Sequence, residues 1–76
     1  MTSAGGADTI DAGTGDNTVN SGAGNDSVVA GDGNDVINAS TGNDTVVAGN
    51  GTNTIDAGTG DNNVTSGTGN DSITAA

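Results

Sequence analysis

The sequence contains no cysteine, histidine, lysine, arginine, glutamate, proline or aromatic residue. Without lysine or arginine, and with a formal net charge of −10, it offers no basic surface to nucleic acid or to an anionic membrane. Without cysteine it has neither a disulfide nor a thiolate metal site. No apolar run is long enough to span a membrane. The residues that usually supply nucleophiles and acid–base groups are also missing, so we expect a protein that is not an enzyme.

The same composition raises a question of stability. Only 29% of the residues are hydrophobic, and the ten acidic residues have no basic partner. A chain with little apolar surface and a high net charge is normally disordered. We therefore expect that this chain cannot fold alone in plain water, and that something must neutralise its aspartates.

What the sequence does contain is a nine-residue repeat, present eight times between residues 3 and 74. Its first position is always Ala or Ser, its fourth is always Gly, and its eighth is always Val or Ile. The eighth-position residues are Ile10, Val19, Val28, Ile37, Val46, Ile55, Val64 and Ile73. A short fixed period is typical of a solenoid, in which each unit buries its apolar face against its neighbours.

Each unit consists of a turn half, G-x-G-N-D, and an extended half, x-[V/I]-x. The glycines permit positive φ, and Asn and Asp favour turns, whereas the β-branched half favours a short strand with its eighth residue pointing inward. One turn and one strand reverse the chain, so two units (18 residues) complete a coil. We predict an all-β fold without helices: a parallel β-roll or β-solenoid with two short parallel sheets and about four coils, forming a single domain over residues 1–76.

In such a coil the sixth-position side chains of alternate units line up along two edges. Edge one carries Asp8, Asp26, Asp44 and Asn62, and edge two carries Asn17, Asp35, Asn53 and Asp71. Successive coils lie about 4.8 Å apart, so stacked carboxylates repel one another unless a cation bridges them. Carboxylate, amide and peptide oxygens are the hard ligands that calcium prefers. The sequence therefore predicts calcium as the cofactor, with these eight residues as candidate ligands.

The two edges are not equivalent. Edge one has two Asp–Asp steps, from Asp8 to Asp26 and from Asp26 to Asp44, whereas every step on edge two pairs one Asp with one Asn. Since Asn lends a carbonyl oxygen but no charge, we expect edge two to bind calcium more weakly. Asp16 and Asp61 precede Asn17 and Asn62 and reverse the usual Asn-Asp order. Whether these fifth-position carboxylates reach an ion is open at this stage.

The units resemble the G-G-x-G-x-D-x-U-x nonapeptides of RTX proteins, over residues 3–74. The resemblance implies a calcium-loaded parallel β-roll and a secreted, extracellular protein, because RTX repeats usually belong to secreted toxins, proteases, adhesins or S-layer proteins. The sequence departs from the pattern in three ways. The first Gly is Ala or Ser, the second Gly is replaced by Ala4 and Ser40, and the sixth-position Asp becomes Asn in three units.

Two functions agree with these features. The first is an extracellular calcium-binding structural module that folds when calcium binds. The alternative is a calcium-rigidified surface that binds ice or carbohydrate, or a repeat fragment of an adhesin or toxin. The outward seventh and ninth positions are mostly Thr, Asn, Asp and Ser, which suits either a solvated face or an ice-binding array. Val29, Val36 and Val47 interrupt the polar columns of such an array.

The ends of the repeat predict self-assembly. Met1 falls on the inward position, and residues 72–75 end as an open strand, so neither end has a polar cap. We expect end-on stacking into a homo-oligomer or filament, with Met1 of one molecule over Ile73 of the next.

Residues 48–74 also repeat residues 3–29 with an offset of 48 − 3 = 45, which is five units, so each copy should fall on the opposite sheet.

Overall fold

The computed structural model describes residues 2–75, which form eight short β-strands and no helix. The strands are β1 (Thr9–Asp11), β2 (Thr18–Asn20), β3 (Ser27–Val29), β4 (Val36–Asn38), β5 (Thr45–Val47), β6 (Thr54–Gly58), β7 (Asn63–Thr65) and β8 (Ser72–Ala75). Every strand begins at the seventh position of its unit, directly after the Gly-, Asn- and Asp-rich turn. The described residues accordingly include no helix that could cross a membrane.

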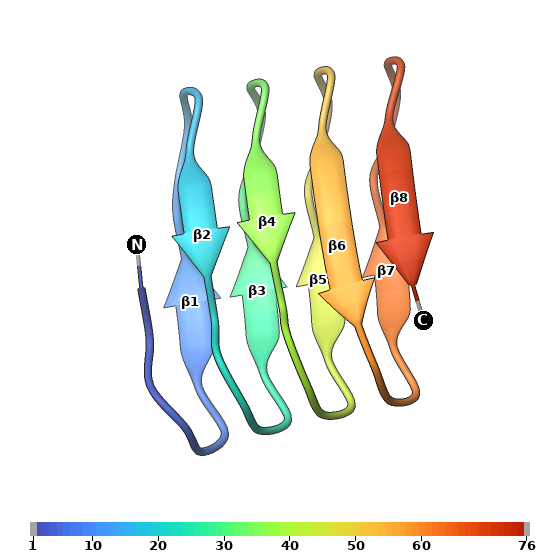
Figure 1. Cartoon of the computed structure of the whole chain (residues 1–76). Helices are drawn as coiled ribbons and strands as arrows, with labels where there is room; N and C mark the ends of the chain where they lie inside the picture. Colours follow the sequence, from blue (N-terminus) through green and yellow to red (C-terminus); the bar gives the residue numbers. More distant parts are fainter. Residues whose placement is uncertain (1, 76) are drawn as a thin grey trace.

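Two parallel sheets form the two layers of the molecule. Their strand orders are β1-β3-β5-β7 and β2-β4-β6-β8, and the strands of the two layers run in opposite directions (Figure 1). Neighbouring strands pair residues 18 apart: Ile10 lies opposite Val28, and Val28 lies opposite Val46. The predicted β-solenoid of about four coils, with 18 residues in each, is confirmed.

The core lies between the sheets and consists of the eighth- and first-position side chains. Ile10, Val19, Val28, Ile37, Val46 and Ile55 are buried, as are Ala30, Ala39, Ala48 and Ala57. The shortest dimension of the molecule is 13 Å, so only small and β-branched side chains fit between the layers. Burial decreases at the carboxyl end, where Val64 is half-buried and Ile73 is 48% exposed because no further coil covers them.

The turns depend on glycine at the fourth position. Gly42 has a φ of 117°, and a Cβ there would collide with the carbonyl oxygen of Gly24 in the preceding coil. The second position also takes positive φ, and Ser40 adopts this conformation (φ 69°) without being glycine. Ser40 is the only residue other than glycine with a positive φ in the described part of the chain.

At the amino end, the chain continues the sheet of β2. Thr2 forms a parallel bridge with Asn20, and the N–H of Ser3 donates to the carbonyl oxygen of Asn20 at 2.8 Å. This register agrees with the prediction that the first residues belong to the even-numbered sheet. Met1, predicted to point inward, lies outside the described residues.

Candidate metal site

The structure brings the four sixth-position residues of edge one into a single row. Each side chain after the first accepts a hydrogen bond from the backbone N–H of the sixth-position residue one coil earlier. The N–H of Asp8 donates to Oδ1 of Asp26 at 2.9 Å, that of Asp26 to Oδ1 of Asp44 at 2.9 Å, and that of Asp44 to Oδ1 of Asn62 at 2.8 Å. The stacking interval is 18 residues throughout, as predicted.

Edge two forms a second row in the same way. The N–H of Asn17 donates to Oδ1 of Asp35, that of Asp35 to Oδ1 of Asn53, and that of Asn53 to Oδ1 of Asp71, all at 2.9 Å. All eight residues that the sequence singled out therefore lie in the two predicted rows.

The inner members of both rows are buried. Asp26 is 3% exposed, Asp35 and Asp44 are each 1% exposed, and Asn53 is fully buried. A coil on either side covers each of them, whereas the members in the terminal coils are half-buried. The rows therefore place negative charge inside a molecule that has no basic side chain.

In four aspartates of the rows, one carboxylate oxygen is buried and has no hydrogen-bond donor. The Oδ2 atoms of Asp8, Asp26, Asp35 and Asp44 are inaccessible to solvent and have no partner among the described residues. Burying a charged oxygen without compensation costs far more than burying a neutral polar atom. Because the chain has no Lys, Arg or His, no side chain supplies a compensating charge, and a bound cation would supply it.

The pKa of Asp44 reflects the cost of burying this negative charge. Burial raises the pKa of its carboxyl group above the ordinary value for aspartate, and the negative charge of Asp26 raises the pKa further. The hydrogen bond with the backbone of Asp26 acts in the opposite direction. Desolvation dominates, so the ionised form of Asp44 is disfavoured in the absence of a counter-charge.

The donor set around these oxygens suits calcium. Among residues 2–75 no three acidic side chains converge on one point, so a cation would take its remaining ligands from the carbonyl groups of the turns. Calcium accepts six to eight oxygen ligands in flexible geometry, whereas zinc and copper sites rely on His or Cys, which are absent.

The comparisons with known proteins agree with this chemistry. A family model for four copies of the RTX calcium-binding nonapeptide repeat matches the chain twice, over residues 2–37 and 38–73. The chain belongs to the RTX calcium-binding repeat family. No curated protein and no solved structure matched. RTX nonapeptide repeats bind calcium, are non-catalytic and typically occur in secreted proteins.

The Asn residues at the sixth position of this RTX chain bond to the turns through both ends of the amide. The oxygens of Asn53 and Asn62 accept backbone N–H groups, at 2.9 and 2.8 Å, as the Oδ1 atoms of the row aspartates do. Their amide nitrogens donate to carbonyl oxygens of the RTX turns. Sequence reasoning considered Asn only as an uncharged oxygen ligand and did not foresee these amide donors.

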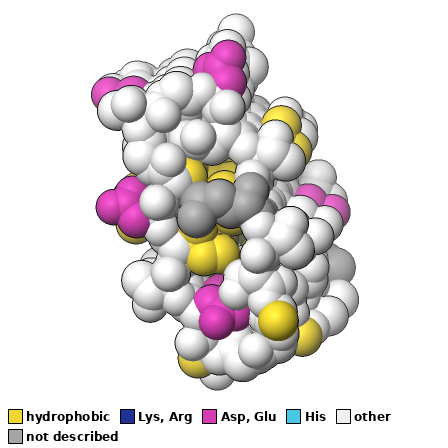
Figure 2. Space-filling model, turned by 90° about the vertical axis from the view of Figure 1, so that its left-hand side faces the viewer, with side chains coloured by type: hydrophobic (Ala, Val, Ile, Leu, Met, Phe, Trp, Pro, Cys, Tyr) yellow, Lys and Arg dark blue, Asp and Glu magenta, His cyan; other side chains and the backbone are white. Residues whose placement is uncertain are grey.

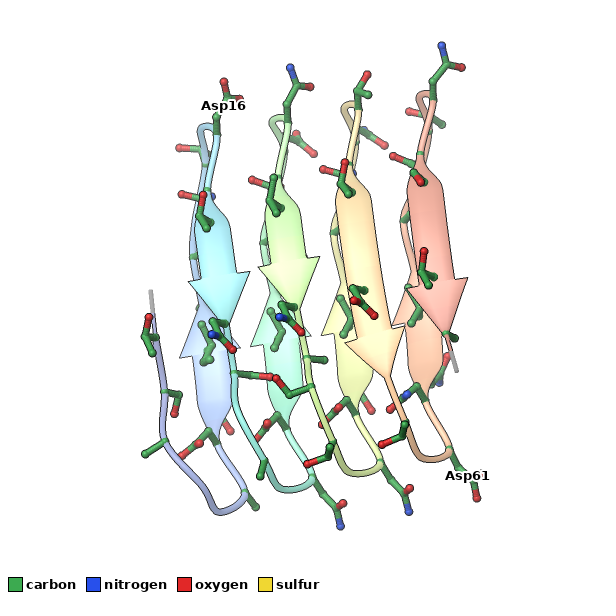
Figure 3. All side chains as sticks on the ribbon, in the orientation of Figure 1. Asp16 and Asp61 are labelled. Carbon is green, nitrogen blue, oxygen red and sulfur yellow. The ribbon has the colours of Figure 1, made fainter. Side chains whose placement is uncertain are left out.

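The fifth-position carboxylates lie outside the rows. Asp16 and Asp61 are exposed and stand at the outer tips of the turns, at opposite edges of the RTX solenoid (Figure 3). Asp16 accepts the N–H of Asn34 at 2.9 Å, and the N–H of Asp61 donates to Asn43 at 2.8 Å. These residues belong to two exterior ladders, one at each edge, so they do not restore a carboxylate to the sixth-position rows.

The amino-terminal end of the molecule shows how the charges are distributed. In Figure 2 acidic side chains lie around the rim of this end, apolar side chains lie near its centre, and no basic side chain is present. The acidic side chains of this rim therefore have no basic side chain as a partner.

Proposed function

We propose that this chain is an extracellular structural module, without enzymatic activity, in which residues 1–76 fold as one domain when calcium binds along edges one and two. The observation that carries the proposal is the set of four buried carboxylate oxygens without a donor. Bound calcium would supply the positive charge that the sequence lacks and would join successive coils.

The residues that would hold calcium are the sixth-position carboxylates, aided by carbonyl groups of the turns. Asp8, Asp26, Asp35 and Asp44 offer the unpaired oxygens. The rows are completed by Asn17, Asn53, Asn62 and Asp71. The extracellular setting agrees with this role, because extracellular modules commonly bind calcium with dissociation constants of about 0.1–1 mM.

Circular dichroism tests the proposal directly. In EDTA the chain should give a coil spectrum, and adding millimolar calcium should convert it to a β spectrum, because calcium that binds only the folded form stabilises it by mass action. Sodium chloride at matched ionic strength, which screens charge without bridging it, should not reproduce the change. A chain that is equally β-rich in EDTA would contradict the proposal.

We also propose that the calcium-loaded module associates end-on into filaments. At the carboxyl end, β7 and β8 are the last strands of their sheets, and Ile73 is half-exposed at the inward position. At the other end, Thr2 continues the even-numbered sheet, so a second molecule could extend both sheets. Such a head-to-tail contact does not close on itself and produces fibres.

Light scattering and electron microscopy after calcium addition test assembly. Ile73→Asp should abolish it, because the charge would lie in the joint. Val36→Asp is the matched control, since Val36 is also half-exposed but lies on an outer sheet face, and this variant should still assemble. A parent chain that stays monomeric at high concentration would contradict the filament.

The alternative function is ice or carbohydrate binding on a sheet face. Its support is the in-register stacking of outward polar side chains, such as Thr54 beside Ser72 and Asp56 beside Thr74. The exposed Val29, Val36 and Val47 interrupt these columns. Thermal hysteresis or glycan binding in calcium buffer would favour the alternative, and the absence of both would favour the structural module.

A further inference from the structure

The asparagines at the sixth position use their amide nitrogen on the carbonyl groups of the turns. Nδ2 of Asn17 lies 2.9 Å from the carbonyl oxygen of Gly13, 3.2 Å from that of Gly15 and 3.2 Å from that of Ala30 in the next coil. One amide group thus contacts three carbonyl oxygens from two successive coils.

Asn53 repeats this arrangement four units later. Its Nδ2 donates to the carbonyl oxygens of Gly49 (3.2 Å), Gly51 (3.5 Å) and Ser66 (3.5 Å). Gly49 and Gly51 occupy the same positions in their unit as Gly13 and Gly15, and Ser66 corresponds to Ala30. The two asparagines of edge two therefore share one arrangement, whereas Nδ2 of Asn62, in the last coil of edge one, donates to Ala57 (3.1 Å) and Gly58 (3.4 Å) of its own unit.

The orientation of the amide follows from its other hydrogen bond. Oδ1 of Asn53 accepts the N–H of Asp35 from the preceding coil, at 2.9 Å. An Asn side chain has one carbonyl oxygen and one amide group, so the nitrogen must face the following coil. The oxygen faces backward along the chain and the donor faces forward.

An aspartate in the same position has a second oxygen, an acceptor, where asparagine has an amide donor. Oδ1 of Asp35 accepts the N–H of Asn17, and its Oδ2 is buried without a donor. By the nine-residue period, the carbonyl groups that correspond to the acceptors of Asn53 belong to Gly31, Gly33 and Ala48. With Oδ2 in the place of Nδ2, oxygen meets oxygen, and at neutral pH a bound cation would make the contact favourable.

We propose that the amide groups of Asn17 and Asn53 take the place of calcium in their gaps, so that calcium enters only the gaps whose earlier residue is Asp. This inference rests on the proposed calcium-dependent function. The gaps that bind calcium follow Asp8, Asp26 and Asp44 on edge one and Asp35 on edge two. The two remaining gaps of edge two, after Asn17 and Asn53, are joined by hydrogen bonds without metal.

The order of residues in a pair thus decides its chemistry. Asp35–Asn53 and Asn53–Asp71 each contain one Asp and one Asn, but only in the first is the earlier residue a carboxylate with a buried oxygen that has no donor. The chain should bind four calcium ions, rather than one in each of its six gaps.

Calcium stoichiometry, measured by calorimetry and by equilibrium dialysis on the full chain, tests this inference. Asn53→Asp should raise the number of bound ions by one, because it creates a bare carboxylate oxygen in the gap before Asp71. Asn62→Asp is the matched control. It makes the same chemical change and adds the same charge, but its residue lies in the last coil of edge one, so the number should not change.

The reverse substitutions form a second matched pair. Asp35→Asn should remove one ion, because its amide would replace calcium in the gap before Asn53. Asp71→Asn should remove none, because it retains the oxygen that accepts the N–H of Asn53 and has no described coil beyond it. Every calcium count is made in the Ile73→Asp background, which should not assemble; sedimentation should confirm a monomer and circular dichroism in calcium should confirm the fold of each variant.

The outcomes separate the two proposals. A parent chain that binds no calcium would contradict the proposed function. A parent chain that binds six ions, or equal changes within either matched pair, would overturn the inference about the amides while leaving calcium binding intact.

Discussion

The backbone N–H of Asp26 donates a 2.9 Å hydrogen bond to Oδ1 of Asp44, the equivalent residue one coil further along the chain. The neighbouring position forms the opposite bond: the N–H of Asn43 donates at 2.8 Å to Oδ1 of Asn25, one coil earlier. The two bonds therefore join the turn at residues 25–26 to the turn at residues 43–44, and each turn supplies one N–H donor and one side-chain acceptor. The inner bond lies in the buried row and the outer one in solvent, so equal changes at these positions should have unequal effects.

Asp26→Ala should weaken calcium binding much more than Asp16→Ala. Asp26 is buried, accepts the N–H of Asp8 and carries an unpaired oxygen, whereas Asp16 is exposed at the tip of its turn. Hydrogen bonds to charged groups are worth about 1.5–3 kcal/mol, so the calcium midpoint should rise roughly tenfold or more for Asp26→Ala. A calcium titration followed by circular dichroism measures both midpoints. Equal midpoints in the two variants would refute the buried-row assignment.

Ser40→Gly should stabilise the calcium-loaded fold by about 1 kcal/mol, because Ser40 holds a left-handed conformation (φ 69°) that costs a side-chain-bearing residue about that much. Ala4→Gly is the matched control, since Ala4 is also at the second position of its unit but is not among the positive-φ residues. That variant should gain nothing. Thermal unfolding in calcium compares them, and a gain in both or in neither would be inconsistent with strain at Ser40.

Gly42→Ala should destabilise the fold strongly. Its Cβ would collide with the carbonyl oxygen of Gly24, and its φ of 117° is one that L residues rarely adopt, a strain of about 1–3 kcal/mol before the collision is counted. Gly5→Ala is the control, because the nearest atom to its added Cβ is 3.9 Å away. Denaturant unfolding in calcium should separate the variants, and similar stabilities would show that the coils can move apart.

Acid should favour the calcium-free fold. The pKa of Asp44 is raised in the folded chain by burial and by Asp26, while the following residue of the row, Asn62, is neutral. A raised folded pKa contributes stability below the unfolded value, near 4, and this stability is lost as the pH rises through the folded pKa. Lowering the pH from 7 towards 4 in calcium-depleted buffer should therefore increase the β signal.

Asp44→Asn provides the control for the pH experiment. It removes the titrating group and supplies a neutral amide, so it should reduce the acid-induced gain in β signal. In the presence of calcium the trend should reverse, because protons compete with calcium for the carboxylates, and the calcium midpoint should rise as the pH falls. A β signal that decreases steadily with acid in calcium-depleted buffer would argue against buried, strained carboxylates.

The period of the sequence was sufficient to predict the strands, the two sheets and the 18-residue register. Each unit has one strongly apolar position, and the only arrangement that buries Val28 and Val46 together also aligns Asp26 with Asp44. Family resemblance and coil geometry pointed to the same rows. The fold and the placement of all eight candidate residues could therefore be predicted.

The direction of the side chains could not be predicted. Whether the oxygen or the nitrogen of Asn53 faces the next coil depends on which neighbour offers a free backbone N–H, and this is a property of the assembled turns. The exposure of Ile73 likewise depends on its position in the last coil, although its unit has the same pattern as the buried ones.

The relation between successive units is close to a twofold screw operation: half a revolution combined with a rise of about 2.4 Å, half the spacing between strands. Removing any one unit from the interior is then equivalent to turning the remainder over by half a revolution, which exchanges the two faces and changes the stacking partners only at the junction. The 45-residue offset is an odd number of such steps, so a residue and its copy, such as Asp26 and Asp71, occupy opposite edges. The molecule can thus change in length by single nonapeptides, and the position of an insertion decides which edge receives each metal ligand beyond it and which residues stack across the junction.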